Sequence, residues 1–172
     1  LYLEDDDKLH LLEGNTRGVT GKQYAPQLIA DQMLKFVREN KDQPFFLYYS
    51  TVIPHLPLQV TEEYLNLYKG KWQETPHKMG SYQPHDTPKA CYAAMITFMD
   101  AQIGRLMNLL VELEIDDNTI VIFTSDNGTT HLKPQVDYEF FESVGKLRGL
   151  KGQLYEGGIR VPLVVRWPGK IK

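Results

Sequence analysis

The sequence is poor in three features that define common protein classes. Its single cysteine, Cys91, excludes an internal disulfide and a cysteine-rich zinc site. Its 19 Lys and Arg residues are outnumbered by 22 Asp and Glu residues, and the net charge of -3 gives no basic surface for nucleic acid. No apolar run reaches membrane-spanning length, and the amino-terminal stretch LYLEDDDKLH has no signal-peptide core. What is present, 42% hydrophobic residues in a chain of 172, is enough to bury one sizeable core.

The order of the apolar segments predicts an α/β fold. Helical spacing of apolar residues indicates an amphipathic helix over 24–40, with Pro26 in its first turn, and a long helix that begins at Lys89. The short runs 44–51 (PFFLYYST) and 119–124 (TIVIFT) are rich in aromatic and β-branched residues, as buried strands are. Helix, strand, long helix and strand in this order predict a mainly parallel sheet with helices on both faces.

Five further features complete this outline. A short helix is expected after Thr61, whose side chain would cap it, and the polar stretch 73–88 is expected to be a surface loop. The run 161–167 predicts another strand. Cys91 lies among apolar residues and is expected to be a buried small hydrophobic residue, not a nucleophile. The acidic run 4–7 is interpreted as solvated surface.

Polar side chains follow two of the predicted strands. Asp126, Asn127 and Gly128 come directly after 119–124, and His55 stands between two prolines after 44–51. Asp-Asn-Gly is ordinary turn chemistry, but the carboxyl end of a buried strand is also where open α/β sheets bind ligands. The two oxygen-bearing side chains suit calcium or magnesium, and calcium takes about six to eight oxygen ligands. Either this is only a turn, or the remaining ligands lie elsewhere.

Four segments in order carry a resemblance to a known family. They are PFFLYYSTVIPHLPLQ, AMITFMDAQIGRLMNLL, DDNTIVIFTSDNG and LRGLKGQLYEGGIRVPLVVRWPG. Together they resemble the type I sulfatases, the formylglycine-dependent, arylsulfatase-like enzymes of the alkaline phosphatase superfamily. The resemblance covers roughly 24–171 and implies that 1–172 is an internal or carboxyl-side part of an α/β catalytic domain of that kind, which would be incomplete.

The resemblance implies a role for each candidate site residue. Asp126 and Asn127 match the family's pair of calcium ligands. His55 matches a histidine that contacts the sulfate ester and is a candidate acid for the leaving oxygen. Lys151 matches a lysine that contacts the sulfate group and is a second candidate for that proton transfer. These types suit the chemistry, because an anionic ester needs fixed positive charge on its oxygens and a proton for the departing group.

Purely structural roles are the alternative for these residues. Alone, a histidine between prolines is usually a packing or surface residue, and a lysine between glycines is usually a solvated turn residue. Glu156 and Arg160 are interpreted as an ion pair that braces the turn at 157–158, in preference to a catalytic pair.

The family's nucleophile motif is missing from the sequence. Type I sulfatases convert the first residue of Cys/Ser-x-Pro-x-Arg to formylglycine, and no such motif occurs here. The motif and the rest of the calcium site are expected on a preceding segment. The chain alone is therefore expected to be inactive.

Two alternative functions are weighed against a sulfatase acting on a sulfated carbohydrate or an aryl sulfate. One is a phosphodiesterase or phosphonate hydrolase of the same superfamily, whose sites generally favour transition metals with additional His and Asp ligands. The other is a non-catalytic glycan-binding remnant. Specificity is expected from the loops 70–88 and 129–147. The family resemblance implies a periplasmic, extracellular or lysosomal location.

Overall fold

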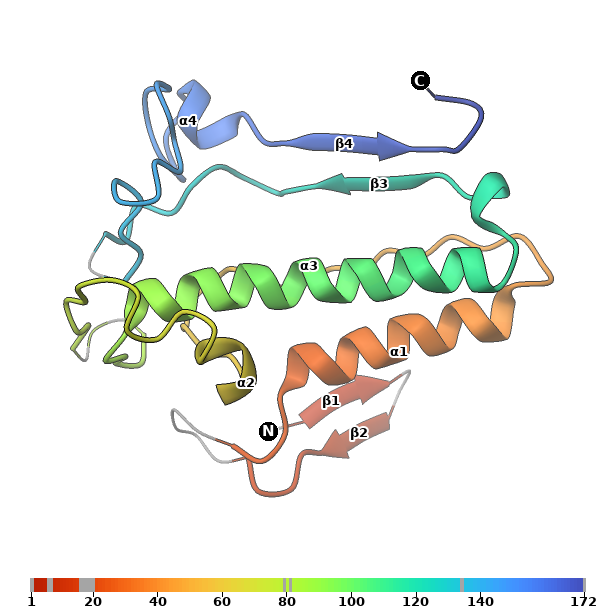
Figure 1. Ribbon diagram of the computed structural model, residues 1–172, viewed down its shortest axis with the longest axis horizontal. Helices are drawn as coiled ribbons and strands as arrows, with labels where there is room; N and C mark the ends of the chain where they lie inside the picture. The colour runs from red at the N-terminus through yellow and green to blue at the C-terminus, as the bar shows by residue number, and fades with distance from the viewer. Residues whose placement is uncertain are drawn as a thin grey trace. The chain divides into compact units, whose positions relative to one another are not determined.

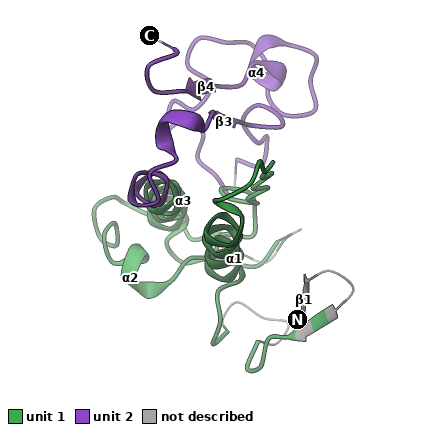
Figure 2. Ribbon diagram, turned by 90° about the vertical axis from the view of Figure 1, so that its right-hand side faces the viewer, with its two compact units in different colours: residues 1–106 green, residues 107–172 purple. Residues whose placement is uncertain are grey.

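The computed structural model describes residues 2–5, 8–15, 21–78, 80, 82–133 and 135–171. The chain divides into two compact units, unit 1 (residues 1–106) and unit 2 (residues 107–172), which Figure 2 shows in green and purple. The expectation that 1–172 belongs to a single catalytic domain stays a prediction.

Helices dominate unit 1, whereas unit 2 is built around one pair of strands (Figure 1). Unit 1 contains β1 (Tyr2–Asp5), β2 (Lys8–Leu11), α1 (Ala25–Asn40), α2 (Glu62–Leu65) and most of α3 (Pro88–Glu112). Unit 2 contains η1 (Asp116–Asn118), β3 (Val121–Thr124), α4 (Glu156–Ile159) and β4 (Leu163–Arg166). The two predicted long helices are confirmed as α1 and α3.

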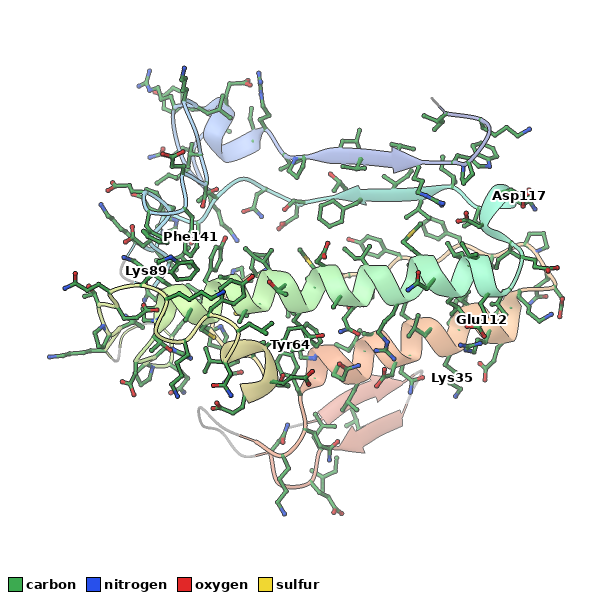
Figure 3. All side chains as sticks on the ribbon, viewed as in Figure 1. Lys35, Tyr64, Lys89, Glu112, Asp117 and Phe141 are labelled. Atoms are coloured by element: carbon green, nitrogen blue, oxygen red, sulfur yellow. The ribbon has the colours of Figure 1, made fainter. Side chains whose placement is uncertain are left out.

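The core of unit 1 lies where α1 and α3 run side by side (Figure 1). α1 buries Ala30, Met33 and Val37, which recur at helical spacing. On α3 the buried ring of Phe98 makes T-shaped contacts with the rings of Tyr24 and Tyr64, with ring centroids 5.1 and 5.3 Å apart. Figure 3 labels Tyr64, which reaches from α2 toward α3. Aromatic contacts of this geometry add to the free energy gained by burying the rings.

Cys91 is fully buried on α3, as predicted. Burial raises the pKa of its thiol to about 12, because a thiolate would lose its hydration in the core. The thiol therefore acts as a small apolar side chain.

The amino-terminal end of α3 is capped by a side chain from the preceding loop. The carboxylate of Glu74 accepts hydrogen bonds from the backbone N–H groups of Lys89 and Ala90, at 3.0 and 2.9 Å. These groups have no partner inside the helix, and Pro88 has no N–H to satisfy. A carboxylate at this end also interacts favourably with the helix dipole. One glutamate thus fixes both the start of α3 and the end of the loop before it.

In unit 2, β3 and β4 form an antiparallel pair in which Val121 faces Arg166. Arg166 donates from Nη1 and Nη2 to the two carboxylate oxygens of Asp116, at 2.5 and 2.8 Å. Trp167 donates from Nε1 to the carbonyl oxygen of Asp117, at 3.0 Å. These bonds join η1, directly before β3, to the end of β4 and so fix the register of the pair.

The predicted parallel sheet is not confirmed, because both strand pairs among the described residues, β1 with β2 and β3 with β4, are antiparallel. Segment 44–51, a predicted strand, forms no strand there. It is extended and exposes alternate side chains, including Phe46 (87% exposed) and Tyr48 (79% exposed). The predicted strands 119–124 and 161–167 are found as β3 and β4.

Of two smaller predictions, one is tested by the structure and one is not. Thr61 precedes α2, but the prediction that its side chain caps the helix is wrong: its buried Oγ1 makes no hydrogen bond among the described residues. The side chains of the acidic run 4–7 lie outside the described residues. None of the helices in the described part of the chain is long and apolar enough to cross a membrane.

Replacing Glu74 with Ala is expected to lower the free energy of unfolding by about 1 kcal/mol, the usual cost of a lost helix cap. Chemical denaturation followed by circular dichroism measures the change. Glu13→Ala is the matched control, because Glu13 is an exposed loop glutamate of the same unit. Equal stability of the two variants would show that Glu74 does not cap α3.

Candidate functional site

The turn after β3 is fixed by backbone contacts with the loop around α4. Gly128 donates its backbone N–H to the carbonyl oxygen of Gly158, at 3.0 Å. Ser125 donates from its hydroxyl to the carbonyl oxygen of Asn127, at 3.1 Å. The carboxylate of Asp126 and the amide of Asn127 therefore project from a turn whose backbone is held on both sides.

The close approach of these loops requires glycine at two positions. A Cβ on Gly128 would lie 2.1 Å from the carbonyl oxygen of Gly157, and a Cβ on Gly157 would lie 2.1 Å from that of Gly149. Both distances are far shorter than any van der Waals contact. Gly157 also donates its N–H to the carbonyl oxygen of Arg148, at 2.8 Å. We call the contact of Gly128, Gly149 and Gly157 the glycine junction.

Lys151 joins the same structure from a later part of the connection between β3 and β4. Its backbone N–H donates to the carbonyl oxygen of Thr129, at 2.7 Å. Lys151 is thus hydrogen-bonded to a residue only two positions after Asn127. The structure brings together the loops of three predicted site residues, Asp126, Asn127 and Lys151.

The side chains of these three residues are available to a ligand. Asp126 is exposed, and Asn127 and Lys151 are half-buried. Within the described ranges, neither the carboxylate, the amide nor the ammonium group takes part in a hydrogen bond or an ion pair. The adjacent carboxylate and amide oxygens fit a hard cation such as calcium. They supply only part of its ligands, and the described residues contain no cluster of three His, Cys, Asp or Glu residues that could hold a metal ion.

Side-chain pairs brace the loop that carries Lys151. The predicted pair of Glu156 and Arg160 is confirmed, with Nε donating to Oε2 at 2.6 Å across α4. Arg148 stacks over the ring of Tyr155, 3.7 Å from its centroid, and donates from Nη2 to the tyrosine hydroxyl at 2.7 Å. These contacts hold the two ends of the loop and leave Lys151 between them.

His55 lies in unit 1, so the structure does not join it to the other three residues. Its backbone N–H donates to the carbonyl oxygen of Val52, at 2.7 Å, and its Nδ1 lies 2.8 Å from the carbonyl oxygen of Leu56. A carbonyl oxygen can only accept, so Nδ1 carries the proton. Among the described residues Nε2 has no hydrogen-bond partner. The imidazole is exposed, so Nε2 is open to a ligand.

The loop 73–88 contributes a contact that sequence reasoning did not find. The edge of Tyr82 meets the ring of His55, with centroids 5.9 Å apart. An isolated antiparallel bridge closes this loop, because His77 and His85 exchange backbone hydrogen bonds of 2.9 and 3.0 Å. The only local signal was the enrichment of this stretch in histidine and aromatic residues.

His85 is held as a neutral imidazole. Its Nδ1 accepts a hydrogen bond from the N–H of Thr87, at 3.1 Å. Burial lowers the pKa of His85, although the carboxylates of Asp86, Glu74 and Glu62 act in the opposite direction. A proton on Nδ1 would abolish the hydrogen bond from Thr87.

Comparisons with known proteins point to one family. A family model described as Sulfatase matches residues 2–172. The chain is similar to the N-acetylgalactosamine-6-O-sulfatase of Bacteroides thetaiotaomicron, with 33% identity over 153 residues that cover 84% of this chain and 26% of the relative. It is 29% identical over 153 residues to the N-acetylgalactosamine-6-sulfatase of Homo sapiens, covering 88% of this chain and 25% of that protein.

A solved structure shows a similar fold. The crystal structure of Ps i-CgsB in complex with k-i-k-neocarrahexaose matches with a TM-score of 0.65 and 30% identity, over 86% of this chain and 29% of that one. The chain spans about a quarter of the length of the curated relatives it matches.

Replacing Gly157 with Ala is expected to destabilise unit 2 by about 1–3 kcal/mol, the usual cost of overpacking, because the new methyl group collides with a carbonyl oxygen. Thermal and denaturant unfolding measure the change. Gly104→Ala is the control: it places a methyl group in open space on α3 and should be neutral or slightly stabilising. Equal stability of the two variants would contradict the glycine junction.

The folded protein is expected to lose stability as the pH falls below about 6.5, partly through His85. Because the pKa of His85 is lower in the folded state, the unfolded chain binds the proton more readily. The stability contributed by neutral His85 is fully present above the pKa of the unfolded state and is lost as the pH falls through the pKa of the folded state. His85→Asn keeps an acceptor near Thr87 and should reduce the loss of stability between pH values of about 7.5 and 5.5. His131→Asn, at an exposed position, should leave the loss unchanged.

Proposed function

Because this chain belongs to the sulfatase family, we propose that the full-length protein hydrolyses sulfate esters of a sulfated sugar or glycan. The observation that carries the proposal is the joining of the Asp126–Asn127 turn to the Lys151 loop, within a chain whose family match extends over 2–172. Both similar N-acetylgalactosamine sulfatases and the neocarrahexaose complex support a carbohydrate substrate.

Lys151 is proposed to bind the sulfate group. A sulfate ester carries a negative charge that is shared by its oxygens, and a fixed ammonium group stabilises that charge during attack at sulfur. The bond from Lys151 N–H to the carbonyl oxygen of Thr129 fixes the base of this side chain. Its ammonium has no competing ion pair among the described residues, so substrate binding does not have to break one.

Asp126 and Asn127 are proposed to hold a calcium ion together with ligands from outside this chain. Their oxygens fit calcium, and among the described residues no hydrogen bond occupies either side chain. When bound, the ion would offset negative charge on the sulfate oxygens. Because the glycine junction fixes the turn, this chain presents both oxygens from a rigid backbone.

His55 is proposed to deliver a proton to the leaving oxygen. The Leu56 carbonyl holds the proton on Nδ1, so a protonated ring donates from Nε2. The ring of Tyr82 packs against the imidazole in a T-shaped contact. The attacking group, expected to be formylglycine, lies outside this chain, which has no Cys/Ser-x-Pro-x-Arg motif. The chain by itself is therefore proposed to be inactive.

Lys151→Ala in the full-length protein is expected to lower kcat/KM for 4-methylumbelliferyl sulfate by about 100-fold to 1,000-fold, the usual effect of removing one group that stabilises developing charge. Lys151→Arg should recover part of the loss. Lys170→Ala is the control, because Lys170 is an exposed lysine of the same unit.

Two results would overturn the proposal. One is an unchanged kcat/KM in Lys151→Ala. The other is hydrolysis of bis(4-nitrophenyl) phosphate by the wild-type protein in preference to the sulfate ester, which would favour the phosphodiesterase alternative. Product formation by the 172-residue chain alone, with the aryl sulfate and calcium, would contradict its proposed inactivity.

A further inference from the structure

Unit 2 contains a cavity of about 630 Å³ that the proposed chemistry does not use. One side is formed by the loop 138–147 and the other by Gly149 and Leu150. Its walls combine an aromatic ring, apolar side chains and charged groups, among them Tyr138, Glu139, Glu142, Val144, Lys146 and Leu147. Its volume is in the range of small-molecule sites.

The cavity adjoins the loop proposed to bind sulfate. Leu150, in its wall, directly precedes Lys151. Val144, also in the wall, reaches the glycine junction, since a Cβ on Gly157 would lie 2.8 Å from its Cγ1. The hydroxyl of Thr129 donates to the carbonyl oxygen of Ser143, at 3.2 Å. The cavity wall is thus continuous in sequence with the residue proposed to bind sulfate and is tied to the backbone segment at Thr129 that Lys151 also contacts.

The loop that forms the cavity wall is ordered by its own backbone. Ser143 donates to the carbonyl oxygen of Tyr138 at 3.0 Å, Glu142 to that of Glu139 at 3.1 Å, and Gly145 to that of Glu142 at 2.9 Å. A wall held in this way loses little conformational freedom when a ligand binds.

The charges of the cavity disfavour a second anion. Lys133 neutralises Glu139 in an ion pair, and its ammonium lies 6.0 Å from the centroid of the Tyr138 ring. Glu142 and Lys146 have no ion-pair partner among the described residues. The two carboxylates and two ammonium groups cancel, so no excess positive charge remains for a second sulfate or a uronate.

We propose that this cavity is a subsite for an uncharged sugar ring next to the sulfated ring. The half-buried face of Tyr138 and the apolar Leu147 suit the C–H face of a sugar. Ring hydroxyls donate to the carboxylate of Glu142 and accept from the ammonium of Lys146. This inference rests on the proposed sulfatase function, because it assigns the part of the substrate beside the reacting ester.

Saturation-transfer NMR on the full-length protein tests the proposal, with lactose and N-acetyllactosamine as neutral probes. The wild-type protein should bind at least one of them. Tyr138→Ala should weaken that binding at least fivefold, whereas Tyr138→Phe should keep it. The matched control is Tyr48→Ala, because Tyr48 is 79% exposed in unit 1. Failure of both sugars to bind, or equal binding by Tyr138→Ala, overturns the proposal.

A charge variant provides a second test that does not depend on the aromatic ring. Glu142→Lys, at an exposed position, should raise the affinity for disulfated N-acetyllactosamine relative to the neutral sugar at least fivefold. An unchanged ratio overturns the proposed exclusion of a second anion. Lys151→Ala should leave binding of the neutral sugar intact. Neutral-sugar binding without sulfate hydrolysis would refute the proposed function, and hydrolysis without binding at Tyr138 would refute only this inference.

Discussion

The candidate site of unit 2 depends on a steric constraint, the absence of side chains at the glycine junction. Gly128 and Gly157 allow backbone segments to approach so closely that a Cβ at either position would lie 2.1 Å from a carbonyl oxygen. This approach permits the hydrogen bonds that join the Asp126 turn to α4 and the Lys151 loop to Thr129. Without it, the predicted metal ligands and the predicted sulfate-binding lysine would lie on independent loops.

Hydrogen-bond partners distinguish the residues that hold the fold from those proposed to act on a ligand. Glu74, Asp116 and Glu156 each have defined partners, and each joins two parts of the backbone. Asp126 and Lys151 have no such partner within the described residues. Their side chains are solvated and available to a ligand, while the backbone that carries them is fixed by hydrogen bonds. The same contrast applies to His55, where Nδ1 is bound and Nε2 is open.

The features that could be predicted from the sequence are local. The helical spacing of Ala30, Met33 and Val37 identifies α1, and the four-residue spacing of Glu156 and Arg160 identifies their ion pair. The predicted cap at Thr61 failed, because a side-chain cap depends on the rotamer, which the sequence does not specify.

The features that escaped prediction depend on contacts between distant segments. β4 pairs antiparallel with β3 because the chain between them returns through irregular loops, with only the four-residue helix α4, and not through a crossover helix. The bridge of His77 with His85 and the contact of Tyr82 with His55 depend in the same way on the path of a loop. The four candidate site residues came from motif resemblance, whereas their joining in unit 2 came from backbone hydrogen bonds.

The single cysteine thiol of the chain provides a way to follow transient opening of the core of unit 1. Cys91 lies on α3 with its side chain buried in the core of unit 1, and burial keeps its thiol protonated at neutral pH. Alkylating reagents can reach it only when the helical core opens, so the rate of modification follows the population of open molecules when reclosing is faster than alkylation. Because no other cysteine competes, each modified molecule gains one mass increment at a known position, with no engineered label.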